Sequence, residues 1–216
     1  MALKSDMLNA FIEARNYTRY LEVGVAQHEN FDRVSCDLKE SVDPDPASNP
    51  TYLMTSDEFW VTVDSRYDII CIDGLHRGDQ VFRDIKGSLD RLEPGGLILL
   101  HDCLPETWEE AAPEANGSWT GDVWQGFAAY RLESPYRTFT ITEDAGCGII
   151  DTVHEILPFP GAKLDPCSFP GKILQSLEGH YTYLSWDFYC DFKEQLLYPI
   201  SIEAFNLLYR RELKEI

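Results

Sequence analysis

Two continuous apolar runs, joined by a helical stretch, most constrain how this chain of 216 residues can fold. The runs are YDIICID, residues 67–73, and GLILLHD, residues 96–102. Runs without alternation are typical of parallel strands that are covered on both faces. Between them Val81, Phe82, Ile85, Leu89 and Leu92 recur at helical spacing, and the turn sequence Pro94-Gly95-Gly96 follows. A strand–helix–strand unit of this kind makes a right-handed crossover, so the two strands lie side by side.

The remaining segments extend the same pattern. Further strands are expected in RYLEVGV (19–25), KESVDPD (39–45, ending near Asp43) and, more weakly, TYLMTS (51–56). A helix over 122–132 is followed by a hairpin formed by YRTFTITED (136–144) and CGIIDTV (147–153). We therefore predict an α/β fold with a doubly wound, mostly parallel sheet, an antiparallel C-terminal hairpin at its edge, and helices on both faces.

Composition excludes several classes of function. The formal net charge of −19, without a basic cluster, disfavours binding to nucleic acid, and no run of apolar residues is long enough to span a membrane. Residues 1–16 are typical of an amphipathic helix and not of a signal peptide. The six cysteines form no CxxC pair, as expected for reduced thiols in a cytoplasmic protein. The acidity favours a neutral or cationic small-molecule ligand.

The loop after the first strand limits the choice of cofactor. LEVGVAQHENF has one glycine, Gly24, whereas a dinucleotide site needs several glycines to bring backbone amides to a pyrophosphate. The acid Glu22 also disfavours a phosphate and suits a cationic cofactor such as S-adenosylmethionine. Asp43, 19 residues after Gly24, is placed to accept hydrogen bonds from ribose hydroxyls. In the alternative interpretation, Gly24 forms a tight turn and Asp43 caps the turn before Pro44.

The two long strands both end in Asp and His. Asp73 and Asp102 close neighbouring strands, about 4.8 Å apart, so their carboxylates need a shared proton or cation. Mg²⁺ or Ca²⁺ would meet that need, and a nitrogen ligand from His101 would favour Mn²⁺ or another transition metal. His76 is suited to accept a proton near neutral pH. The alternatives are that Asp73 caps the next helix, that His76 is a turn histidine, and that His101 only holds Asp102 in place.

Taken in order, YLEVGV, VDPDP, SDEFW, YDIICIDGLH and PGGLILLHDC resemble the class I S-adenosylmethionine-dependent methyltransferases over residues 20–105. The IDGxH and HDC strand ends resemble a bacterial branch, the macrocin-type sugar O-methyltransferases. The resemblance implies that the cofactor lies against Glu22, Gly24, Asp43, Ser56, Asp57 and Asp73. It also implies that Asp73 and Asp102 are metal ligands, leaves the ligand role of His101 open, and makes His76 the general base. Two departures, the missing second glycine and Gly78 in place of an aromatic residue, concern the cofactor loop and the acceptor contacts.

The expected function is therefore an S-adenosylmethionine-dependent O-methyltransferase acting on a hydroxyl of a sugar or other small polyol, with a role for Mg²⁺ or Mn²⁺ left open. Residues 1–156 are expected to form the catalytic domain, with His76, Asp73 and Asp102 as its catalytic residues. Residues 157–216 are expected to be an extension that packs on the same domain or makes a homodimer interface. The alternatives are a non-catalytic cofactor-binding or assembly subunit and, less favoured, a nicotinamide oxidoreductase.

Overall fold

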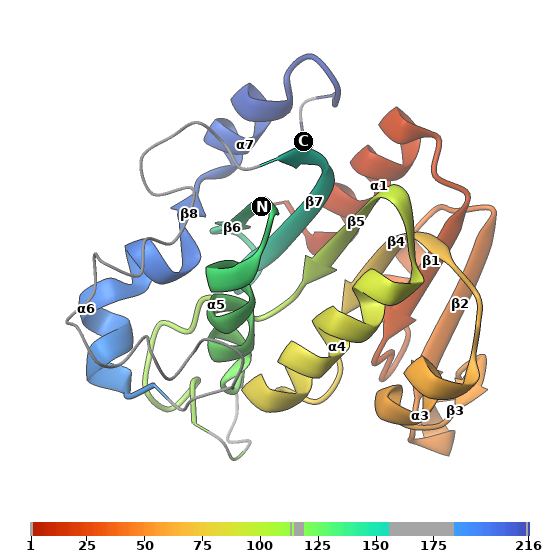
Figure 1. Ribbon diagram of the computed structural model, residues 1–216, viewed down its shortest axis with the longest axis horizontal. Coiled ribbons are helices and arrows are strands. Elements are labelled where there is room, and N and C mark those ends of the chain that lie inside the picture. Colours follow the sequence, from red (N-terminus) through yellow and green to blue (C-terminus); the bar gives the residue numbers. More distant parts are fainter. Residues whose placement is uncertain (1, 113, 115–118, 156–183, 215) are drawn as a thin grey trace.

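One eight-stranded sheet forms the centre of the protein (Figure 1). The computed structural model describes residues 2–112, 114, 119–155, 184–214 and 216. The strands are β1 (Arg19–Val23), β2 (Leu38–Asp43), β3 (Tyr52–Leu53), β4 (Tyr67–Ile72), β5 (Leu92–Leu100), β6 (Tyr136–Ile141), β7 (Cys147–Glu155) and β8 (Pro199–Ile200). Their order is β3-β2-β1-β4-β5-β7-β6-β8, with β7 antiparallel to both of its neighbours. The expected doubly wound sheet with a C-terminal hairpin is confirmed, and β8 adds outside the hairpin.

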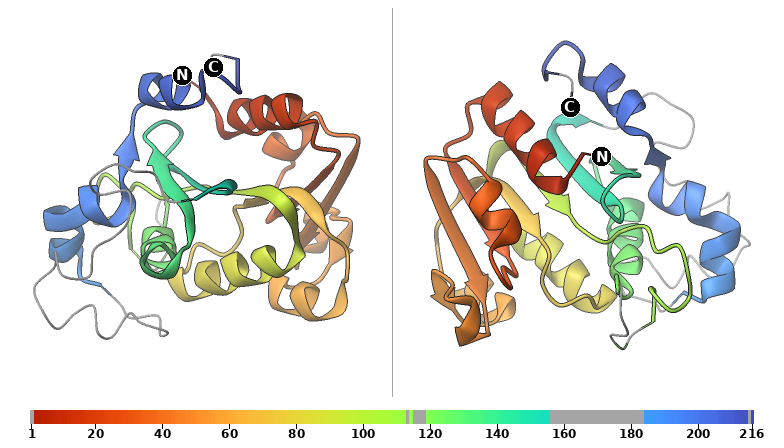
Figure 2. Two further views of the ribbon diagram at one scale, coloured as in Figure 1. Left: turned by 45° about the horizontal axis from the view of Figure 1, so that its top comes forward. Right: turned by 180° about the vertical axis from the view of Figure 1, so that it is seen from behind.

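Helices cover both faces of the sheet, as the two further views show (Figure 2). One face carries α1 (Lys4–Arg15), α2 (Glu29–Arg33) and α7 (Ile202–Tyr209), and the other carries α3 (Ser56–Thr62), α4 (Gly78–Arg91), α5 (Val123–Glu133) and α6 (Trp186–Leu197). Neighbouring residues of one strand enter different cores: Ile69 belongs to the core that contains Phe11 of α1, whereas Ile70 belongs to the core that contains Phe127 of α5. Burial on both faces is the reason that the long strands are continuously apolar.

The crossover β4–α4–β5 sets the register that matters for function. The expected turn at Pro94-Gly95-Gly96 lies inside β5, which begins at Leu92, and the pairing with β4 shifts there. Beyond the shift the pairing is regular up to Ile72 and Leu100. The residues after these two partners, Asp73 and His101, therefore leave neighbouring strands at the same level.

The C-terminal segment packs on both faces of the sheet where it is described. Residues of α6 join the core beneath α5, and Phe205 and Tyr209 of α7 join the core beneath α1. The start of the expected extension, residue 157, lies outside the described residues, as does the segment up to residue 183. In the described part of the chain, no helix has the length and apolarity needed to cross a bilayer.

Candidate active site

Asp73, His76, His101 and Asp102, here called the rim cluster, meet where β4 and β5 end. Asp73 Oδ1 lies 3.4 Å from His76 Nε2 and 3.3 Å from His101 Nδ1. Asp102 Oδ2 lies 3.4 Å from the same His76 nitrogen and 3.2 Å from the same His101 nitrogen. Carboxylate oxygens and imidazole nitrogens thus alternate around a ring. The structure brings together all four residues expected from the ends of the two strands.

The backbone at Asp102 aims its carboxylate at this ring. Its φ of 60° lies in the left-handed region, which costs a non-glycine residue about 1–2 kcal/mol. The turn sends the next side chain, Cys103, into the core, where the thiol is fully buried. Burial raises the pKa of Cys103, so this thiol is not a nucleophile.

The long loop after β5 holds His76 in position. Trp119 stacks on the His76 ring, with centroids 4.9 Å apart and planes at 30°, and its indole Nε1 donates a 2.6 Å hydrogen bond to Ala112. Gly121 (φ 62°) lies so close to the His76 carbonyl that a side chain would collide with it. Asp122 closes the contact, since its backbone N–H donates to the His76 carbonyl at 3.3 Å. In the described part of this loop, which also contains Trp108, Trp119 is therefore the tryptophan that stacks on the rim cluster.

Burial opposes protonation of the two rim imidazoles, but the surrounding carboxylates outweigh it. Asp102, Asp144 and Asp73 raise the pKa of His101 to about 11. Asp73 and Asp102 raise the pKa of His76 above its ordinary value. Although burial also opposes ionisation of Asp73, hydrogen bonds from the two histidines hold the pKa of that carboxyl well below its usual range. The carboxylates therefore hold His101 as an imidazolium, and they stabilise a proton that His76 accepts.

The rim cluster also offers ligand atoms for a divalent metal, and an imidazole that holds the metal would be deprotonated. Ligand atoms of a tetrahedral site, about 2.1 Å from the metal, lie about 3.4 Å apart. The four N–O spacings around the ring, 3.2–3.4 Å, are close to this value. Two nitrogens with two oxygens favour a transition metal such as Mn²⁺ over Mg²⁺. Asp73, His76 and Asp102 each offer one atom within 4.8 Å of the others, and His101 is not a member of this set.

Two residues beside the rim cluster had no signal in the sequence. Lys4, at the start of α1, forms an ion pair with Asp73 through the second carboxylate oxygen, Oδ2. Burial opposes the charge on Lys4, but Asp73 raises its pKa above the ordinary value, so Lys4 is a cation. Asp144, in the turn between β6 and β7, lies 3.7 Å from His101 Nε2. Both come from chain segments that are remote in sequence from Asp73.

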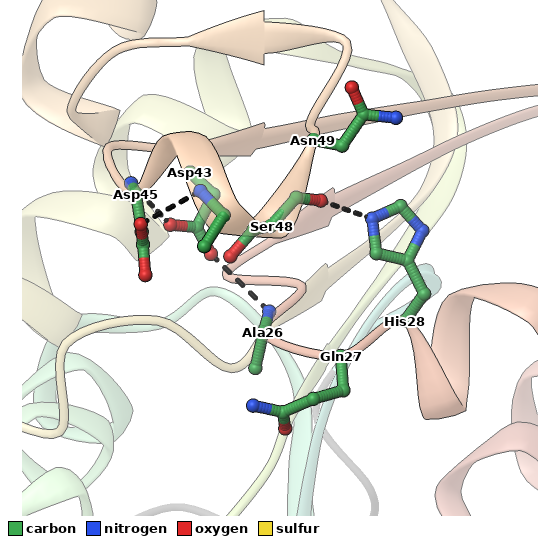
Figure 3. A pocket seen from close by; sticks show the side chains of 8 residues that line it. Ala26, Gln27, His28, Asp43, Asp45, Ser48 and Asn49 are labelled. Carbon is green, nitrogen blue, oxygen red and sulfur yellow. Dashed lines mark hydrogen bonds between the residues drawn. The ribbon is translucent and has the colours of Figure 1, made fainter.

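A cavity of about 630 Å³ opens beside the first loop, at the ends of β1 and β2 (Figure 3). It is lined by Ala26, Gln27, His28, Asp43, Asp45, Ala47, Ser48 and Asn49. The Asp43 carboxylate accepts hydrogen bonds from the N–H groups of Val25 at 3.0 Å, Ala26 at 3.4 Å and Asp45 at 2.8 Å. Asp43 thus fixes the loop, as the alternative interpretation expected, and also faces the cavity. The wall formed by residues 47–49 was not expected from the sequence.

Gly24 and Glu22 lie at the inner end of the first loop. Gly24 has φ 81°, and a side chain there would collide with the backbone of Asp73, so β1 and β4 approach closely only because this residue is glycine. Glu22 is buried, which raises its pKa to about 7 even though Tyr20 and Asn30 donate hydrogen bonds to it. A carboxyl in this condition ionises readily when a cation arrives nearby.

Ser56 and Asp57, predicted beside the adenine, begin α3 and face α4. Gln80 Nε2 donates to Ser56 Oγ at 3.1 Å and to Asp57 Oδ1 at 3.0 Å, and Arg83 Nε donates to the same Asp57 oxygen at 3.2 Å. Neither residue is among those that line the cavity next to Asp43. Their cofactor role stays a prediction of the resemblance.

A second cavity, of about 810 Å³, shares Asp144 with the surroundings of His101. Its walls come from the loop after β5, the β6–β7 turn and α6, and include Glu106, Glu110, Thr120 and Lys193. Its volume lies in the range of small-molecule sites. The rim cluster therefore has a polar cavity close to it on the side of β5, and the Asp43 cavity lies on the side of β2.

Comparison with known proteins bears on this geometry. Residues 16–103 match the sequence profile of a family described as "Methyltransferase domain". The matched segment contains Asp43 and the whole rim cluster, and the expected enzyme class, a methyltransferase, is therefore confirmed. No curated protein matches the chain.

Solved structures show the same fold. TomG, an O-methyltransferase from Streptomyces achromogenes solved with S-adenosylmethionine, is 13% identical with a TM-score of 0.52, covering 69% of this chain and 79% of that one. A putative caffeoyl-CoA O-methyltransferase from Staphylococcus aureus is 16% identical with a TM-score of 0.55, covering 70% and 84%. A methyltransferase from Podospora anserina bound to S-adenosylhomocysteine is 16% identical with a TM-score of 0.53, covering 70% and 79%. At these identities the likeness establishes the fold.

Proposed function

We propose that this chain is an S-adenosylmethionine-dependent O-methyltransferase that acts on a hydroxyl of a sugar or another small polyol. One observation carries the proposal: the Asp43 cavity and the rim cluster follow β2, β4 and β5 along one edge of the sheet. In open α/β sheets, ligands bind at this edge, outside the carboxyl ends of the strands. The solved relatives that hold S-adenosylmethionine or its product support the choice of donor.

The donor is assigned to the Asp43 cavity and the first loop. Asp43 retains lone pairs beyond those that hold the loop, and these would accept hydrogen bonds from ribose hydroxyls. Gly24 allows the cofactor to pass close to the backbone, and Glu22 and Asp73 provide negative charge for the cationic methionine end. Ser56 and Asp57 are proposed as contacts of the adenine end.

His76 is proposed as the general base. When bound, S-adenosylmethionine supplies an electrophilic methyl group, and a divalent metal would lower the pKa of the acceptor hydroxyl. His76 takes the hydroxyl proton at Nε2, and the carboxylates of Asp73 and Asp102 stabilise the imidazolium that results. Trp119 keeps the imidazole plane fixed during this transfer. In this scheme Asp73, Asp102 and His101 would hold the metal, which leaves His76 for the proton.

The polyol acceptor is supported by the IDGLH and LLHDC strand ends and by the polar cavity beside Asp144. Radiolabelled S-adenosylmethionine, incubated with the protein and a panel of sugars, cyclitols and catechols, tests the reaction. We expect transfer to a polyol. Failure to bind the donor at millimolar concentration would contradict the function itself, and transfer only to catechols would contradict the acceptor class.

The role of His76 has its own test, with His154→Gln as a control, because His154 is a partly exposed histidine on β7 that pairs with Glu212. We expect His76→Gln to lower kcat by about 100-fold or more while donor affinity is kept. His101→Gln, but not His76→Gln, should weaken Mn²⁺ binding by about tenfold. Unchanged turnover in His76→Gln would remove the base assignment, and full activity of metal-free protein in EDTA would remove the metal.

A further inference from the structure

Lys4 lies outside the matched segment, and its side chain binds Asp73, an acid of the rim cluster. Lys4 binds two acids from different parts of the sheet, one with its side chain and one with its backbone. The ammonium pairs with Asp73, after β4, and the backbone N–H donates a 2.7 Å hydrogen bond to Asp144, in the β6–β7 turn. The first turn of α1 is thereby fixed against the rim cluster.

The two oxygens of Asp73 consequently have different partners. Oδ2 is paired with the Lys4 ammonium, and Oδ1 faces the imidazoles of His76 and His101. A metal in the ring can therefore bind Asp73 through Oδ1 alone, as long as Lys4 keeps Oδ2. The Lys4 side chain is only 13% exposed, so water screens its charge weakly.

The surroundings also offer Lys4 an alternative position. A cavity of about 200 Å³ is lined by Lys4, Glu29, Arg33, His101 and Asp144, among others. The two acids in this cavity give the ammonium other carboxylates to approach if a second cation displaces it from Asp73. A divalent ion that binds both oxygens of Asp73 would therefore have to break the ion pair between Lys4 and Asp73.

We propose that Lys4 is a positioning residue that sets the affinity of the rim cluster for divalent cations. It acts as a built-in counter-cation of Asp73: it orients Oδ1 towards the ring and repels a divalent ion that shares the same carboxylate. The inference rests on the metal site of the proposed function. It adds that the protein binds the metal more weakly than its ligand atoms alone would allow, and that the cause is a residue of the N-terminal helix.

Mn²⁺ titration followed by electron paramagnetic resonance, without donor or acceptor, tests the inference. Lys4→Met should lower the Kd for Mn²⁺ by about tenfold or more, because a like charge at a poorly screened distance is removed. Lys4→Arg, which keeps the charge, should stay near the wild-type Kd. Lys214→Met is the matched control: Lys214 also pairs with an acid, Glu13 of α1, but at an exposed site, and it removes the same net charge.

The outcomes are distinguishable. Three results would overturn the inference. The first is an equal Kd for Mn²⁺ in wild type and Lys4→Met, and the second is an equal gain in Mn²⁺ affinity in Lys214→Met. The third is a lack of Mn²⁺ binding in every variant. If Lys4→Met does not fold, as judged by circular dichroism, Lys4→Gln replaces it with the same expected change. Titration of S-adenosylmethionine into the same variants reports on the Asp43 cavity separately, so failure of the metal inference and failure of the proposed function give different results.

Discussion

Replacement of Asp43 is the perturbation whose effect on donor binding can be worked out from the structure. Its carboxylate holds the first loop through two good backbone hydrogen bonds, at 3.0 and 2.8 Å, and a longer one at 3.4 Å. These N–H groups lie at a partly exposed site, so water replaces the carboxylate and Asp43→Ala should cost only about 1 kcal/mol of stability. A hydrogen bond from a ribose hydroxyl to a carboxylate contributes about 1.5–3 kcal/mol. Its loss therefore corresponds to a rise in the Kd for S-adenosylmethionine of about 10- to 150-fold.

Isothermal titration calorimetry measures this change directly. Asp45→Ala is the matched control, since Asp45 lines the same cavity and its carboxylate accepts a hydrogen bond from the N–H of Ala47 at 2.9 Å. We expect the control to stay within about threefold of the wild-type Kd and Asp43→Asn to fall between the two. A Kd for Asp43→Ala that matches the control would refute the placement of the ribose, and an equal loss in both variants would show a nonspecific charge effect.

Three further changes test other parts of the structure. Trp119→Ala removes the ring that stacks on His76, so kcat should fall by about tenfold with little change in donor Kd; an unaltered kcat would contradict the positioning role. Asp151→Asn should destabilise the fold by about 3 kcal/mol in urea unfolding, because Asp151 is fully buried and accepts two hydrogen bonds from Arg15, at 2.9 and 3.0 Å. Asp64→Asn is the control: Asp64 pairs with Arg91 at an exposed site, so its unfolding free energy should change little. Although burial opposes ionisation, Arg15 lowers the folded-state pKa of Asp151, so this stability is present above the unfolded pKa of about 3.9 and is lost as the pH falls below it; a wild-type acid slope that Asp151→Asn retains would contradict this. Burial raises the pKa of Glu22 to about 7, so the stability that its protonated carboxyl contributes is present below the unfolded pKa of about 4.5 and is lost as the pH rises towards 7. Glu22→Gln should therefore remove roughly 3 kcal/mol of the change in unfolding free energy over this pH interval. An unchanged pH dependence in Glu22→Gln would contradict the burial effect.

The strand ends were predictable from sequence because they depend on a local pattern. A continuous apolar run identifies a buried strand, and the first polar residues after it lie at the edge of the sheet. This reasoning placed Asp43, Asp73 and His101 correctly at strand ends. The crossover rule then made β4 and β5 neighbours, and the observed register, Ile72 beside Leu100, brought the two ends together.

The missing parts of the site depend on contacts between remote segments. Lys4 reaches Asp73 across 69 positions of sequence, and the N–H of Lys4 reaches Asp144 across 140. No pattern near Lys4 distinguishes it from any other lysine at the start of an amphipathic helix. The relation of His76 to His101 was hidden for a different reason: both imidazoles contact the Asp102 carboxylate, and Asp102 has a left-handed backbone with φ 60°, an angle that sequence does not report.

The position of the cofactor is the central claim, and a crystal structure with S-adenosylhomocysteine and Mn²⁺ tests it most directly. The ribose hydroxyls should lie within hydrogen-bond distance of the Asp43 carboxylate, with the sulfur atom directed towards the rim cluster and the ion between Asp73 and Asp102. A product molecule bound with its ribose away from Asp43, or with its sulfur turned away from His76, would contradict the account.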